Sequence, residues 1–121
     1  MREARLSELR KFSATKFLPE LVYGSAGARA FLLCLEPGQG LPLRPDSEEV
    51  VCYVIEGRVR FRRAEEELTL AAGDLAGADP GEARGVTADE RAVVLWIQIE
   101  NRRVEESRSR RGERQEARDE D

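Results

Sequence analysis

Histidine is missing altogether from this chain of 121 residues, and cysteine occurs only twice. The absence of histidine removes the commonest metal ligand of proteins and their commonest general acid and base. The two cysteines, Cys34 and Cys52, cannot complete a four-ligand zinc site unless carboxylates join them. Both lie in apolar, strand-like runs, so we expect buried free thiols rather than a disulfide or a redox pair.

Long apolar runs and an excess of positive charge are also absent. No run approaches the ~20 residues that cross a bilayer, and residues 1–12 lack the apolar core of a secretory signal. The formal net charge of −4 gives no reason to expect nucleic acid or an anionic membrane as a partner. We therefore expect a cytoplasmic protein, and the length of the chain predicts a single domain with one core.

The chain does contain a series of short strand-forming runs between residues 17 and 100. Their apolar residues are either continuous or alternate with polar ones, and turn residues separate one run from the next. Seven to nine short strands in one domain indicate an all-β sandwich or barrel. The expected strands are Leu21–Tyr23, Ala28–Glu36, Val50–Ile55, Arg58–Arg62, Glu67–Ala72, Leu75–Ala78, Gly85–Thr87 and Ala92–Glu100.

The last of these strands has two unlike faces, because side chains alternate along a strand. One face is wholly apolar and consists of Val93, Leu95, Ile97 and Ile99. The other face is mixed and consists of Val94, Trp96 and Gln98. We expect the apolar face to pack against a second sheet, and the mixed face to form a cavity wall or an oligomer contact.

The two ends of the chain break the strand pattern. Residues 1–16 predict a short arm or helix, in which Leu6 and Leu9 touch a core from one helical face. Residues 101–121 are almost entirely polar and cannot bury enough surface to offset the entropy of ordering, so we expect a disordered tail. A charged helix held by Glu–Arg pairs is the alternative. The barrel itself then spans residues 17–100.

Two motifs lie between the expected strands. Residues 38–57 read G-x5-R-x-D-x3-V-x6-G, and residues 73–84 read G-x5-D-x-G-x2-R. With His, His and Glu in place of Arg44, Asp46 and Val50, the first is the first cupin signature. With Pro and His in place of Asp79 and Arg84, the second is the second signature. Residues 17–100 thus resemble a small single-domain bacterial cupin, which implies a double-stranded β-helix, a jelly-roll-like barrel, and a homodimer.

In the metal-binding cupins that the motifs resemble, three His and a Glu at these positions hold a divalent metal. Arginine stays protonated in proteins and valine has no donor atom, so we predict neither a bound metal nor a cofactor here. Glu48 and Glu49 lie nearby but miss the expected spacing. A bulge that turned Glu49 inward beside Asp46 would leave a weak site for a hard cation with oxygen ligands.

Three uses remain for Arg44, Asp46 and Arg84. A salt bridge from Asp46 to either arginine would link the strands in place of a metal, because a buried charge must be paired. Two converging guanidinium groups would instead bind the carboxylate or phosphate of a small ligand. In the third use, the arginines reach solvent and bury only their stems. The candidate ligand-binding residues are Arg44, Asp46, Glu49, Tyr53, Arg84 and Trp96.

Three functions are compatible with these residues. We favour a metal-independent barrel that binds a small anionic ligand or serves as a regulatory module, without catalysis. The second is an enzyme, either a metal-free isomerase, cyclase or lyase or a carboxylate-bound metalloenzyme. The histidine base of cupin sugar epimerases cannot be carried over, so Asp46 or Glu49 would act as the base. The third is a structural dimer whose tail recruits a partner.

Overall fold

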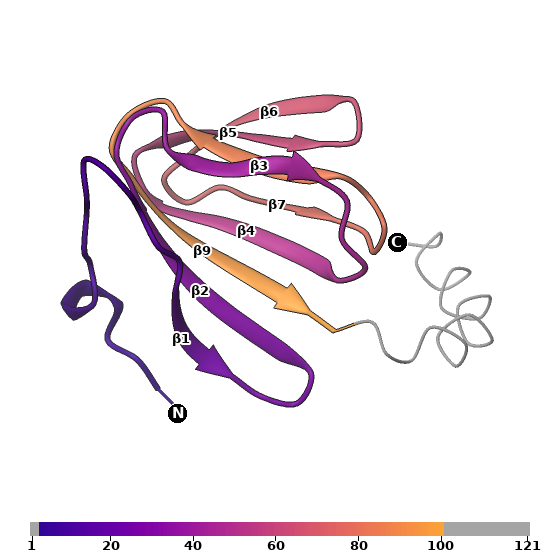
Figure 1. The fold of residues 1–121 in the computed structure, drawn as a ribbon, viewed down its shortest axis with the longest axis horizontal. Coiled ribbons are helices and arrows are strands. Elements are labelled where there is room, and N and C mark those ends of the chain that lie inside the picture. The colour runs from indigo at the N-terminus through magenta and orange to yellow at the C-terminus, as the bar shows by residue number, and fades with distance from the viewer. Residues whose placement is uncertain (1–2, 101–121) are drawn as a thin grey trace.

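The computed structural model describes residues 3–100, which form two antiparallel sheets that face one another (Figure 1). The elements are η1 (Leu6–Glu8), β1 (Glu20–Gly24), β2 (Ala28–Leu35), β3 (Gly40–Arg44), β4 (Glu49–Glu56), β5 (Arg58–Arg63), β6 (Glu66–Ala71), β7 (Leu75–Ala78), β8 (Arg84–Ala88) and β9 (Ala92–Ile99). The first sheet has the order β1-β2-β9-β4-β7 and the second the order β3-β8-β5-β6. Within residues 3–100 no helix is long and apolar enough to cross a membrane.

The expected all-β barrel is confirmed, and every expected strand forms within one residue of its predicted bounds. The structure adds β3, which the sequence does not suggest because Pro42 lies at its centre and cannot donate a backbone hydrogen bond. β3 is an edge strand of the second sheet, which is the place where a sheet tolerates proline. The predicted disordered tail, residues 101–121, lies outside the described residues and stays a prediction.

The main core lies between the two sheets. Val50, Cys52 and Val54 of β4 alternate toward it and are fully buried. Across the core, Phe61 of β5 packs on Trp96 of β9, with ring centroids 6.1 Å apart and ring planes inclined by 56°. A tilted aromatic pair of this kind adds to the stabilisation that burial of its area provides.

The orientation of β9 is the reverse of the expected one. Val94 and Trp96, from the mixed face, belong to the core between the sheets, and Gln98 continues that face at the end of the strand. The wholly apolar face of β9 lies on the outside of the first sheet, where Val93 is buried in a second cluster. The expectation was wrong because Trp96 brings a large apolar area to the core, while Gln98 lies at the end of the strand, where polar partners are available.

The N-terminal arm covers part of this outer face, so the first sheet has protein on both sides near β2 (Figure 1). The buried residues of the outer cluster are Val22, Leu32, Cys34 and Val93. Leu6, Leu9 and Phe12 of the arm pack against them, as the spacing of Leu6 and Leu9 predicts. The Arg91 guanidinium lies 3.6 Å from the centroid of the Phe12 ring and adds a cation–π contact. The continuous apolar run of β2 is therefore explained by burial on both faces.

Gly57, in the tight turn between β4 and β5, is required for two reasons. Its φ of 82° lies in the left-handed region that side chains disfavour. A Cβ at this position would also lie against the carbonyl oxygen of Arg91 and 2.8 Å from the Cα of Ala92. Gly73 has a φ of 92° but no atom within 4 Å of an added Cβ. A substitution at Gly73 therefore measures the cost of the left-handed conformation without a steric clash.

We expect Gly73→Ala to lower the free energy of unfolding by about 1 kcal/mol, the cost of the left-handed conformation alone. Gly57→Ala should lower it by at least about 3 kcal/mol, because the backbone at Arg91 must also move. Urea denaturation of both variants measures the difference. Equal losses would contradict the steric role of Gly57.

Both cysteines are free and buried, as predicted. Burial in the core raises the pKa of the Cys52 thiol from 9.0 to about 12. Above pH 9 the unfolded chain loses this proton while the native protein keeps it. The contribution of the neutral thiol to stability is therefore complete below pH 9 and is lost as the pH rises toward 12.

Replacing Cys52 by Ala should remove this dependence. Between pH 9 and 12, we expect the stability advantage of the wild type over Cys52→Ala to shrink by about 1.4 kcal/mol per pH unit. Guanidinium denaturation of both proteins at a series of pH values measures the advantage, and the other titrating groups cancel in the comparison. An advantage that stays constant over this range would show that the thiol titrates normally.

Candidate functional site

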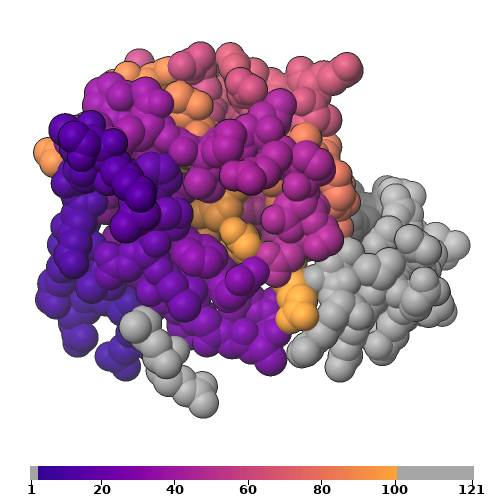
Figure 2. Space-filling model, viewed as in Figure 1, coloured from indigo at the N-terminus to yellow at the C-terminus, as the bar shows by residue number. Residues whose placement is uncertain are grey.

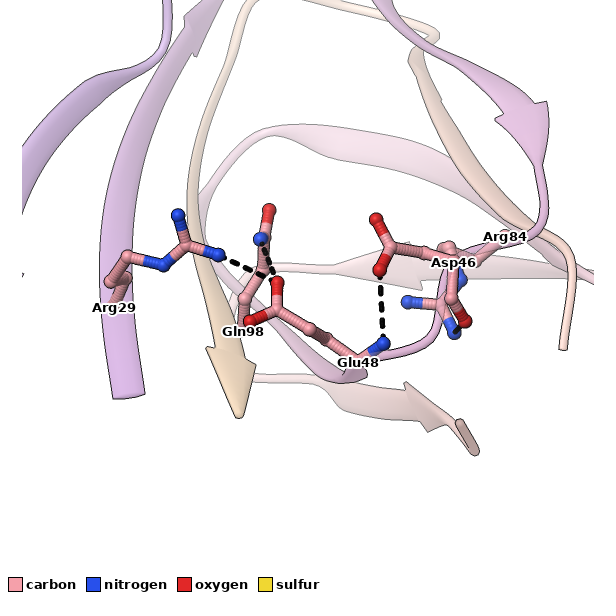
Figure 3. A network of polar contacts seen from close by, with 5 residues as sticks. All are labelled: Arg29, Asp46, Glu48, Arg84 and Gln98. Carbon is pink, nitrogen blue, oxygen red and sulfur yellow. Dashed lines mark hydrogen bonds and ion pairs between the residues drawn. The ribbon is translucent and has the colours of Figure 1, made fainter. Parts of the chain in front are cut away.

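Polar side chains gather at the end of the barrel where β2 begins, β9 ends and the loop between β3 and β4 passes, which we call the mouth (Figure 3). In the space-filling view this mouth appears as a hollow between β2 and the segment around β3 and β4, with atoms of β9 at its floor (Figure 2). The residues that the motifs single out lie around this mouth or on the strands that lead to it.

Arg84 is the one buried charged residue in the described part of the chain, with 5 % of its surface exposed. It begins β8, directly opposite Arg44 of β3. Its Nε donates to the carbonyl oxygen of Glu82 at 2.7 Å. Its NH2 group donates to the carbonyl oxygens of Asp79 at 2.9 Å and Asp46 at 3.4 Å. The guanidinium therefore ties the loop before β8 to the loop after β3 through backbone carbonyl groups.

The salt bridge expected between Asp46 and either arginine does not form. Among residues 3–100, no ion pair joins the Asp46 carboxylate to Arg44 or Arg84. Asp46 Oδ1 instead accepts a hydrogen bond from the backbone N–H of Glu48 at 2.9 Å, which stabilises the loop between β3 and β4. Backbone carbonyl groups solvate the Arg84 guanidinium, so the carboxylate is not needed there.

The pocket of two converging arginines does not form either. Carbonyl oxygens already accept hydrogen bonds from the Nε and NH2 groups of Arg84, so the Nε–NH2 edge of its guanidinium is not free to hold an anion in the bidentate way. Arg44 is exposed, which agrees with the third use considered for it. That use is wrong for Arg84, which is buried.

A different polar cluster crosses the mouth (Figure 3). Glu48 Oε1 accepts one hydrogen bond from Arg29 NH2 and another from Gln98 Nε2, both at 2.7 Å. Arg29 and Gln98 lie opposite each other in the pairing of β2 with β9. The Glu48 side chain is 17 % exposed and that of Arg29 is 47 % exposed. Two charge-assisted hydrogen bonds thus join three segments that are far apart in the sequence.

The sequence carries only a partial sign of this cluster. Glu48 precedes the buried Val50 by two positions, so it has the parity of the inner face, whereas Glu49 has the opposite parity. The meeting of Arg29 with Gln98 depends on the register of β2 against β9, which no local pattern reveals.

The other candidate residues lie away from the mouth. Glu49 and Tyr53 belong to the outer face of β4, because the residues that alternate with them are in the core. Trp96 is buried between the sheets against Phe61 and so supports the core. Of the six candidates, the structure brings Asp46 and Arg84 together at the mouth and leaves Arg44 exposed opposite Arg84.

The side chains at this site do not fit a transition metal. Val50 is fully buried and has no donor atom, and the nitrogens of Arg84 are donors rather than ligands. The outward position of Glu49 removes the second carboxylate on which a weak oxygen site would depend. Over residues 3–100, no three His, Cys, Asp or Glu side chains gather closely enough to hold an ion.

Comparison with known proteins agrees with the motifs. Residues 31–98, more than half of the chain, match the cupin domain family, and the chain belongs to that family. The crystal structure of TT1209 from Thermus thermophilus is similar at a TM-score of 0.77 and 29% identity, over 82% of this chain and 97% of that one.

Two further crystal structures are similar in fold. An RmlC-like cupin from Desulfovibrio desulfuricans is similar at a TM-score of 0.73 and 24% identity, over 82% of this chain and 96% of that one. A cupin superfamily protein from Desulfitobacterium hafniense has a TM-score of 0.73 and 13% identity, over 83% of this chain and 92% of that one. No curated protein matches the chain in sequence.

Removal of the buried guanidinium tests the structural role of Arg84. We expect Arg84→Ala to lower the free energy of unfolding by about 2–4 kcal/mol, because the hydrogen bonds that join the two loops are lost and a cavity replaces a buried side chain. Arg62→Ala, an exposed arginine on neighbouring β5, should change it by less than about 0.5 kcal/mol. Chemical denaturation compares the two variants, and an equally small effect of both would contradict the proposed role of the carbonyl contacts.

Proposed function

We propose that this protein is a metal-independent binding module of the cupin family that takes a small hydroxylated organic ligand, a sugar or a hydroxy acid, at the barrel mouth. The observation that carries the proposal is the inward carboxylate of Glu48, held between Arg29 and Gln98. A carboxylate and a guanidinium side by side at an open mouth can recognise a hydroxyl group and a neighbouring oxygen of one ligand.

The hydrogen bonds at the mouth leave polar atoms that can bind a ligand. Both bonds to Glu48 go to Oε1, so Oε2 is available to accept a ligand hydroxyl. The NH2 group of Arg29 donates to Glu48, and the Arg29 side chain is nearly half exposed. The other N–H groups of Arg29 can therefore donate to a ligand oxygen. The partly buried ring of Phe31, 6.0 Å from the Arg29 guanidinium, offers an apolar wall beside these groups.

This ligand class modifies the small anion expected from two arginines. Arg84 is committed to carbonyl groups, and the charge of Arg29 is balanced by Glu48. A compound that is only anionic would meet the Glu48 carboxylate without a donor to offer it, whereas a hydroxyl group supplies that donor. We propose binding rather than catalysis because the chain has no histidine and the Glu48 carboxylate already accepts two hydrogen bonds.

Calorimetric titration with a panel of sugars, sugar phosphates and hydroxy acids tests the proposal. For a compound that binds, we expect Glu48→Gln to weaken the affinity at least about tenfold, because an acceptor and a charge are lost at constant shape. Arg29→Ala should have a similar effect. Glu67→Gln changes an exposed carboxylate on β6 in the second sheet and should leave the affinity unchanged.

Two results would overturn the proposal. The first is an absence of heat with every compound of the panel, or equal affinity of the wild type and Glu48→Gln. The second is a stoichiometric transition metal in protein purified without chelator, which would require ligands other than the residues at the mouth.

A further inference from the structure

A separate cavity lies on the opposite side of the first sheet from the core, beneath the N-terminal arm. Its volume is about 600 Å³, and small-molecule sites commonly measure roughly 300–1,000 Å³. The arm runs beside β1 and β2 in this region (Figure 1). Leu9, Phe12 and Phe17 from the arm side and Leu32 from β2 give the cavity apolar walls.

The cations at this cavity are unusual for the chain. Lys11 and Lys16 are the only lysines among its 20 basic residues, and both line the cavity. Within residues 3–100 neither ammonium group takes part in an ion pair. Glu20 is the one carboxylate of the lining, so the cavity has an excess of positive charge in a protein whose net charge is −4.

The remaining lining completes an amphipathic site. The buried Cys34 thiol belongs to the wall, and burial raises its pKa, so the thiol is neutral at pH 7 and acts as an apolar group. Leu18 and Leu21 also line the cavity although both are exposed to solvent. Exposed leucines beside unpaired ammonium groups match the two parts of an amphipathic anion.

We propose that this cavity binds a small amphipathic anion, an apolar chain or ring that carries one carboxylate. The apolar part lies against Leu9, Phe12 and Leu32 and gains the free energy of leaving water. The carboxylate lies beside Lys11 and Lys16, which have no other counter-ion in the described chain. An amphipathic cation would meet two like charges, and a neutral compound would leave both ammonium groups unmatched.

Because the chain has only two lysines, NMR signals from labelled lysines report directly on this cavity. Reductive methylation with ¹³C-formaldehyde labels Lys11, Lys16 and the N-terminal amine and keeps the lysine charges. Titration with octanoate should shift both lysine signals saturably. Octylammonium, which has the same apolar chain, should bind at least about tenfold more weakly because of charge repulsion. Unshifted lysine signals with octanoate, or binding of octylammonium or 1-octanol as tight as that of octanoate, would overturn the proposal.

Two matched variants locate the binding. Leu21→Glu places a negative charge at a cavity residue that is 52% exposed, and should weaken octanoate binding about tenfold. Leu75→Glu makes the same change at a residue that is 62% exposed, on β7 at the opposite edge of the sheet, and should leave binding unchanged. Equal effects of the two variants would overturn the assignment to this cavity.

Two further comparisons complete the test. Glu48→Gln, at the barrel mouth, should keep full octanoate binding, so the two sites are distinguished. Loss of octanoate binding in Glu48→Gln would show that the cavity is not a separate site.

Sedimentation tests whether a second copy of the chain occupies the cavity instead. A dimer that dissociates on Leu21→Glu, with no octanoate binding to the wild type, would mean that a second copy of the chain covers the cavity and would overturn the proposal.

Discussion

The open end of this barrel depends on a buried guanidinium that is solvated by backbone carbonyl groups rather than by a counter-ion. Arg84 donates to three carbonyl oxygens that belong to the loops before β8 and after β3. Each bond to a charged donor stabilises the fold more than an ordinary neutral one, and together they offset the cost of burying the charge. Arg84 thus links the loop before β8 to the loop after β3.

Two carboxylates complete the polar contacts at the mouth. Asp46 accepts a hydrogen bond from the backbone N–H of Glu48 within its own loop, and Glu48 joins Arg29 to Gln98 across the opening. The first sheet then presents two different surfaces. Its inner side ends in the polar mouth, and its outer side, under the N-terminal arm, holds a cavity that is lined by apolar side chains and by both lysines. We propose a hydroxylated ligand for the first surface and an amphipathic anion for the second.

Much of the fold was predictable, and specific residues explain the failures. The expected strands formed because alternation and turn residues are local signals, and the motif spacing indicated the family. β3 was missed because a proline such as Pro42 is unfavourable within a strand except at the edge of a sheet, and the sequence does not reveal that β3 is an edge strand. The inner face of β9 was assigned wrongly because hydrophobicity alone favoured the other face, although Trp96 and Phe61 pack across the core.

By itself, the sequence determined the strand positions, the cupin frame and the lack of a histidine metal set, since these depend on residue type and spacing along the chain. Only the tertiary structure decided that Arg84 bonds to carbonyl groups, that Glu48 meets Arg29 and Gln98, and that both lysines line one cavity. The physical reason is that these contacts arise from the register of strands distant in the sequence and from the packing of the arm on the sheet.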